Sequence, residues 1–254
     1  AQFRLAEIQY RIIEDFDKAS NLYIAALSEN PPLELKKKII LRIGDVLLAK
    51  GDYNKSISFL DSIYTIYKIP EIKNKLVEMH LFSGNPDTAL SMINNIFLTL
   101  SPINNTFNDL MEIRDIINHY YIESDQNSKN AFKKFLKSEF LLKQRKVTEA
   151  SQLLDYIIKN NTGLELTPLI SLRRAILLMR LKNFDETLNQ LQSIENTIFA
   201  DRGIIMSGQI HEQIYNDTPK AMDYYMRILN EYSDSIYSEP IRYHIRKLKD
   251  VEKI

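Results

Sequence analysis

The sequence contains no cysteine and no tryptophan, and it has only 6 glycines and 8 prolines among 254 residues. Without cysteine, disulfides, thiolate metal sites and thiol catalysis are excluded. So few helix-breaking residues in so long a chain favour helices over many short strands and tight turns. The hydrophobic content of 44% and the charged content of 26% are those of an ordinary folded protein, so disorder is not expected.

A charge excess and a long apolar run are also missing. The 33 Lys and Arg residues equal the 33 Asp and Glu residues, whereas a general nucleic-acid or membrane-surface binder usually carries a basic excess. No run approaches the ~18 apolar residues of a membrane span, and no signal peptide is visible. The expected helix 1–13 begins at Ala1 itself, so we expect this sequence to be a fragment of a longer chain. The missing signal peptide therefore does not determine the location.

Two segments near the start of the chain resemble each other: RLAEIQYRIIEDFDKA at 4–19 and RIGDVLLAKGDYNKS at 42–56. Each runs Arg, apolar, small, acidic, apolar, and then reaches a polar turn with an aromatic residue and a further small residue. This similarity predicts an internal repeat. The turn recurs as GNPDTA at 84–89, RKVTEA at 145–150, KNFDET at 182–187 and NDTPKA at 216–221.

A small residue opens the second helix expected after each turn, and a large apolar residue follows four positions later. Because four residues make about one helical turn, both should lie on one buried stripe, where the small residue lets a neighbouring helix approach. The small residues are 33 to 37 positions apart, except for one interval of 61 that predicts an additional element. The pairs are Ala19 and Tyr23, Ser56 and Leu60, Ala89 and Ile93, Ala150 and Leu154, Thr187 and Leu191, and Ala221 and Tyr225.

The first helix of each expected pair also carries a small or short residue. Glycine inside a helix costs roughly 1 kcal/mol relative to alanine, so Gly44 and Gly208 predict close helix crossings. Three prolines follow capping residues and mark helix starts, at Pro86, Pro168 and Pro219. The short residues are Ala6, Gly44, Val77, Ser138, Ala175 and Gly208.

These patterns predict an all-α chain made of helix pairs over a single domain, 1–254. A helix near 104–122 stands where the long interval requires one, and a capping helix at about 238–253 closes the chain. The predicted pairs are 1–13 with 16–28, 33–50 with 53–67, 71–83 with 86–99, 128–144 with 147–160, 167–181 with 184–195, and 200–215 with 218–231.

The repeat resembles the tetratricopeptide family, whose units read L-G-x2-Y, then A-x3-F, then P over about 34 residues. Ile43, Gly44 and Leu47, then Ser56 and Leu60, and then Pro70 follow that order in one unit, and Ala221 with Tyr225 follow it in the last. The family's tryptophan is absent, and residues 100–127 do not fit. The resemblance implies a right-handed α-solenoid whose first helices line a concave binding surface.

The C-terminal run AMDYYMRILNEYSDSIYSEPIRYHIRKL, 221–248, is similar to the ends of tetratricopeptide proteins of the bacterial cell envelope. This resemblance favours a periplasmic or envelope location over the cytoplasm.

No catalytic constellation stands out. His211 and Glu212 begin the H-E-x-x-H zinc signature, but Tyr215 stands where the second histidine is required. No G-x-S-x-G elbow or phosphate loop is present. We therefore predict no enzyme and no cofactor or metal site. A helical hydrolase that brings His and Asp together from different units is the third possibility.

The segment 129–146 is the strongest charge feature, with seven Lys and Arg residues against Glu139 alone. Lys129, Lys133 and Lys137 form an i, i+4 stripe, which is typical of a solvated helix face over a packed aromatic one. A docking patch for an acidic peptide or for single-stranded RNA is the alternative.

The leading hypothesis is a non-catalytic scaffold that binds a protein or peptide partner on the concave surface, in a bacterial envelope complex. The alternative is a nucleic-acid-binding helical repeat that uses 129–146. By repeat register, the candidate partner-binding residues are Tyr10, Asp45, Phe82, Phe132, Glu139, Arg180, Gln209 and Glu212.

Overall fold

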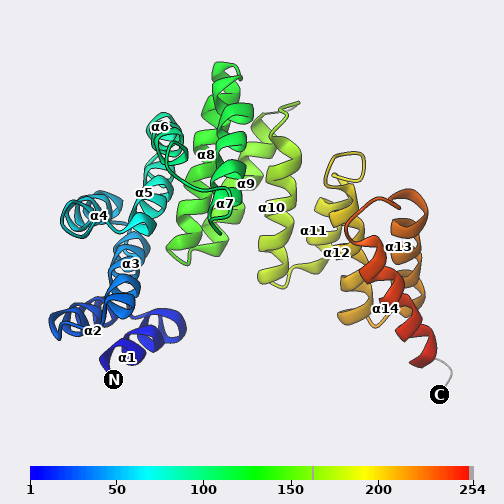
Figure 1. Cartoon of the computed structure of the whole chain (residues 1–254). Helices are drawn as coiled ribbons and strands as arrows, with labels where there is room; N and C mark the ends of the chain where they lie inside the picture. The colour runs from blue at the N-terminus through cyan, green and yellow to red at the C-terminus, as the bar shows by residue number, and fades with distance from the viewer. Residues whose placement is uncertain (162, 252–254) are drawn as a thin grey trace. The chain divides into compact units, whose positions relative to one another are not determined.

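The computed structural model describes residues 1–161 and 163–251, which form helices joined by short connections (Figure 1). No β-strand occurs in these residues. They group into two compact units, Ala1–Ala150 and Ser151–Ile254, named unit 1 and unit 2 below. The all-α prediction is confirmed, and the expectation of one solenoid over 1–254 stays a prediction.

Unit 1 runs from α1 to the start of α9. In Figure 1, α2 and α4 lie to one side of α3. Within the range 104–122, which interrupts the repeat, the structure has α7 and a π-helix, η2. The elements are α1 (Gln2–Ile8), the π-helix η1 (Gln9–Ile13), α2 (Phe16–Ser28), α3 (Leu33–Ala49), α4 (Tyr53–Tyr67), α5 (Pro70–Phe82), α6 (Pro86–Phe97), α7 (Phe107–Ile117), η2 (Asn118–Ile122) and α8 (Gln126–Lys143).

Unit 2 continues from α9 (Val147–Asn160), which begins in the last residues of unit 1. Residues 252 and 253 of the predicted capping helix lie outside the described residues. No described helix is both long and apolar enough to span a lipid bilayer. The remaining elements are α10 (Thr167–Arg180), α11 (Phe184–Gln192), α12 (Ala200–Gln213), α13 (Thr218–Glu231) and α14 (Ser238–Val251).

Within each unit, hydrophobic cores join a helix pair to the helix that follows it. Ala6 of α1, Tyr23 of α2 and Ile43 of α3 share one core, and Leu172 of α10 and Ile210 of α12 share another. Repeats that touch mainly their neighbours are the defining feature of a solenoid. The prediction of an α-solenoid built from helix pairs is thus confirmed.

The predicted stripe of small and large residues is the centre of this packing. Each of its members, from Ala19 and Tyr23 to Ala221 and Tyr225, has at most 1% of its surface exposed. Burial of one such large side chain contributes about 1.5–3 kcal/mol. The short residues of the first helices are buried as well.

The predicted close crossings at Gly44 and Gly208 are confirmed. A Cβ atom added at Gly44 would lie 3.1 Å from Leu60 Cδ1, and one added at Gly208 would lie only 2.5 Å from Tyr225 Cε1. The small residue of a first helix therefore sits directly against the large residue of the second helix in the same pair.

Each turn within a pair begins with a residue in the left-handed conformation, which lets the chain leave one helix and enter the next. The turns of the first and last pairs are one residue longer, and in both a backbone N–H bonds to the carbonyl six residues earlier. Asp15 donates to Gln9 at 3.0 Å, and Asp217 donates to His211 at 2.8 Å. The left-handed residues are Glu14, Gly51, Gly84, Arg145, Lys182 and Asn216.

Candidate interaction surface

A row of alternating charges crosses the first helices of unit 1. It begins where Arg11 Nε of η1 lies 2.6 Å from Glu7 Oε2 of α1. The other oxygen of Glu7 accepts a hydrogen bond from Arg42 Nε of α3 at 2.8 Å, and Arg42 Nη1 donates to Asp45 Oδ2 at 2.9 Å. Ion pairs thus tie α1 to α3.

The row continues from α3 to α5 and α8. Lys75 Nζ of α5 lies 2.5 Å from Asp45 Oδ1 and also pairs with Glu78, which in turn pairs with Lys143 of α8. We call these residues the ion-pair row: Arg11, Glu7, Arg42, Asp45, Lys75, Glu78 and Lys143.

The repeat register explains why these charges meet. Asp45 and Glu78 directly follow the short residues Gly44 and Val77, and each has a cation three residues earlier on the same helix face. The two aligned segments already contained this signal, as the Arg and the acid that flank the small residue. This signal marks the charged positions on each first helix, but it does not show which charges on neighbouring helices they meet.

Mutual electrostatic stabilisation sets the protonation of the row. Burial alone would raise the pKa of Glu78, but the ammonium groups of Lys75 and Lys143 hold it below its ordinary value. Burial alone would lower the pKa of Lys75, yet Glu78 and Asp45 raise it. The pKa of Glu7 is lowered, against burial, by Tyr23 and Arg42. All three groups are therefore held in their charged forms.

Aromatic rings with cations above them border the row. The guanidinium carbon of Arg145 lies 5.8 Å from the ring centre of Tyr10, and Lys143 Nζ lies 5.3 Å from that of Phe82. Burial, followed by the charge of Asp45, raises the pKa of Tyr10. Of the predicted residues, Tyr10, Asp45 and Phe82 thus gather around the ion-pair row.

Phe132 does not belong to a surface. It is fully buried, with ring centres 5.9 Å from Tyr121 of η2 and 6.3 Å from Phe135. Its prediction as a partner-binding residue needs correction, because η2 lies outside the repeat pattern and covers this position. Glu139, about two turns further along α8, is half-buried.

The candidates in unit 2 are scattered over different surroundings. Arg180 is exposed at the end of α10. Gln209 is exposed and lines a shallow pocket of about 350 Å³ with Ile176, Arg202 and Tyr237, among others.

Glu212 is mostly engaged within the fold of unit 2. It accepts a hydrogen bond from the Tyr225 hydroxyl at 2.6 Å, and its Oε2 lies 2.8 Å from His244 Nε2. Burial alone would raise the pKa of Glu212, but the bonds to Tyr225 and His244 lower it. This carboxylate holds α12, α13 and α14 together.

His211 and Glu212 contact different residues within unit 2. The His211 ring stacks on Tyr224 at 5.5 Å with 13° between the planes and lies 5.4 Å from Tyr215, whereas Glu212 meets other residues. Among the described residues, no group of three or more His, Cys, Asp or Glu is placed to hold a metal ion. His211 is a core residue of the last helix pair.

His211 predicts a pH dependence of unit 2. It is 5% exposed, and burial, followed by Lys220, lowers its pKa below the ordinary 6.5. Between that value and the folded pKa the unfolded chain binds more protons, so the free energy of unfolding should fall as pH falls below 6.5. Denaturant unfolding at stepped pH should show this loss, and His211→Phe should remove it. An unchanged slope in that variant would contradict the assignment.

Much of the positive charge of 129–146 is matched within unit 1. Lys143 pairs with Glu78, Arg145 Nε lies 3.4 Å from Glu14 Oε1, and Lys146 Nζ lies 3.7 Å from Glu149 Oε2. Lys129 and Lys133 lie over the Tyr121 ring, at 5.6 and 5.5 Å. These contacts offset the charge that a nucleic-acid interface would need.

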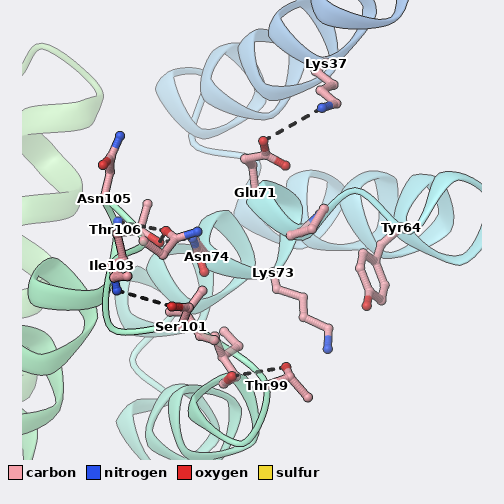
Figure 2. Close-up of a pocket in the computed structure, with 14 residues that line it drawn as sticks. Lys37, Tyr64, Glu71, Lys73, Asn74, Thr99, Ser101, Ile103, Asn105 and Thr106 are labelled. Carbon is pink, nitrogen blue, oxygen red and sulfur yellow. Dashed lines mark hydrogen bonds and ion pairs between the residues drawn. The ribbon is translucent and has the colours of Figure 1, made fainter.

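A pocket of about 780 Å³ lies beside the segment that interrupts the repeat (Figure 2). Its polar groups pair with one another: Asn74 Nδ2 donates to Thr106 Oγ1 at 2.9 Å, and Lys37 Nζ lies 4.0 Å from Glu71 Oε1. Lys73 Nζ lies 5.3 Å from the centre of the Tyr64 ring. Asn74, Thr106, Lys37 and Glu71, four of the polar residues that line the pocket, thus already have partners.

The repeat length, the buried small and large residues and the pair-to-pair cores together define the architecture. The fold is tetratricopeptide-like. No protein-family model matches the chain, and no curated protein matches it.

Among solved structures, the chain is similar to the "TPR2AB-domain:pHSP90-complex of yeast Sti1", at 15% identity over 95% of both chains and a TM-score of 0.40. At this level of similarity we draw nothing from it about function.

Proposed function

We propose that this chain is a non-catalytic scaffold and that the ion-pair row of unit 1 binds a protein or peptide partner. The row itself is the observation that supports this proposal. Its members come from α1, η1, α3, α5 and α8 and form one connected set of charges. Solenoids use such side-by-side first helices as extended binding surfaces.

The chemistry of the row suits an extended polypeptide. Exposure ranges from 14% for Asp45 and 16% for Lys75 to 54% for Arg11, so the middle forms a half-buried floor and the ends are open. Carboxylates can accept hydrogen bonds from peptide N–H groups, while Lys and Arg can donate to carbonyls and acidic side chains. Alternating charges also make the match with a partner specific.

The resemblance of 221–248 to the ends of envelope proteins supports a bacterial envelope complex as the setting. We do not propose nucleic acid as a ligand, because the chain carries no basic excess.

A peptide library displayed on phage should yield ligands for the purified chain. For an enriched peptide, we expect Arg11→Gln combined with Lys143→Gln to weaken binding roughly tenfold, since two partly exposed charges are removed. Isothermal titration calorimetry would measure the dissociation constant of each variant.

Arg242→Gln and Lys247→Gln in α14 are the matched controls. Arg242 pairs with Glu239 one turn away, as Arg11 pairs with Glu7, and Lys247 lies over the Tyr243 ring as Lys143 lies over Phe82. The controls should leave binding unchanged. If both sets of variants lost the same affinity, the binding site would not be the ion-pair row. If the library yielded no ligand, the proposed scaffold function would be contradicted.

A further inference from the structure

A stripe of large aliphatic side chains is exposed on the first helix of unit 1. Leu5 is 47% exposed, Ile8 43% and Ile12 75%. Leu5 and Ile8 are three residues apart in α1, which places them on one side of that helix, and Ile12 follows in the π-helix η1. Contiguous exposed apolar side chains of this size usually mark a surface that another element covers.

The repeat register identifies what covers this position elsewhere in the chain. Leu5 and Ile8 flank Ala6 as Ile43 and Val46 flank Gly44. Ile43 and Val46 are only 3% and 0% exposed, because they share a core with the second helix of the preceding pair, through Ala19, Tyr23 and Ala26 of α2. In the next first helix, the corresponding residues Leu76 and Met79 are 2% and 0% exposed.

The last helix, α14, buries its apolar side chains and exposes a polar outer face. In α14, Ile241 and Ile245 are 7% and 5% exposed, within a core that they share with α12 and α13. Its outward positions are Arg242, Tyr243 and Lys247. A terminal helix with a polar outer face is what ends a repeat array in water, whereas α1 exposes Leu5 and Ile8 beside Arg4.

We propose that the stripe Leu5, Ile8 and Ile12 receives the second helix of a further helix pair of this repeat type, carried by the same polypeptide ahead of α1. The occupant packs on α1 as α2 packs on α3. The proposal extends an interface that the chain already uses, between the second helix of one pair and the first helix of the next. The outer face of α14 is not apolar, so it offers no head-to-tail partner for the stripe, and a twofold contact of α1 with α1 is the competing occupant that the test below separates.

Single cysteines can report on the stripe, because these 254 residues contain none. Ile8→Cys should react with a thiol reagent at least ~10-fold more slowly in the full natural polypeptide than in residues 1–254 alone, with any native cysteines replaced by serine. Val46→Cys, at the corresponding covered position, should react slowly in both. Tyr243→Cys, on the outer face of α14, should react rapidly in both.

Equal reaction rates of Ile8→Cys in the two polypeptides would overturn the proposal, as would a natural polypeptide with no residues ahead of Ala1. Protection that appears in residues 1–254 only as the protein concentration rises, and that Leu5→Glu removes, would identify a second copy as the occupant and would also overturn it. These outcomes do not depend on the ion-pair row or on any peptide ligand.

Discussion

Replacing Gly208 with alanine is expected to destabilise unit 2 by about 2–3 kcal/mol, whereas the same exchange at Gly44 should stay within about 1 kcal/mol of neutral. Alanine favours a helix by roughly 1 kcal/mol at either site. At Gly208, however, the new Cβ would lie 2.5 Å from Tyr225 Cε1 and 2.9 Å from Cδ1. Helix propensity cannot offset an overlap of that size.

The Tyr225 ring has little room to move away. Its hydroxyl is bonded to Glu212 at 2.6 Å, and its edge meets the His244 ring at 5.4 Å. At Gly44 the nearest atoms are instead the terminal methyl carbons of Leu60, at 3.1 and 3.3 Å. A leucine side chain can adjust by a few tenths of an ångström at small cost.

Hydrogen exchange measured for each helix would give the stability of each unit separately, whereas a single melting temperature would combine the two. A double-mutant cycle supplies the control: Gly208→Ala should cost much less when Tyr225→Leu is already present, because that pair then copies Gly44 and Leu60. An equal cost in both backgrounds would show that the glycine is required for a reason other than the ring.

The sequence predicted this packing because small and large residues recur at a fixed spacing. Equivalent positions are occupied by Ala19 and Tyr23 in the first pair and by Ala221 and Tyr225 in the last. Residues four apart lie on the same face of an α-helix, so both members of each pair must be on the buried face. The sequence also shows Arg42 and Asp45 at fixed distances from Gly44. The sequence does not show the partners of these charges on other helices. Contacts such as that of Glu7 with Arg42 depend on how successive first helices pack side by side.

The prediction that Phe132 contacts a partner was wrong for a related reason. Repeat register placed it on an inward surface, but η2 and its Tyr121 come from the segment that breaks the repeat. A periodic pattern cannot predict the position of an element that does not follow the period. The row and the covering by η2 therefore required the three-dimensional structure.

Replacing Lys75 with methionine is expected to destabilise unit 1 by about 2–4 kcal/mol near neutral pH. Methionine keeps the apolar stem of the side chain, so the loss isolates the ammonium group, which is the shared partner of Asp45 and Glu78. Lys75 is only 16% exposed and Asp45 14%, so water can replace the lost partner only in part. The two carboxylates would then also face each other across the gap.

The pH dependence distinguishes this electrostatic cause from a packing defect. In the natural chain, the folded pKa of Glu78 lies below its ordinary 4.5, so its contribution is present above that pH and is lost as pH falls through the folded pKa. Without Lys75 that contribution is already reduced at neutral pH. The difference between the two proteins should therefore shrink as pH is lowered past 4.5, which denaturant unfolding followed by hydrogen exchange would measure.

Lys55→Met is the matched control for Lys75→Met. Lys55 is 71% exposed and pairs with Asp52 within its own turn, at 3.0 Å, so its loss should cost less than about 0.5 kcal/mol. A methionine at position 75 that costs no more than one at position 55 would show that the row contributes little to stability. Its charges would then be free to exchange partners at almost no cost, and a bound polypeptide could replace each internal ion pair in turn.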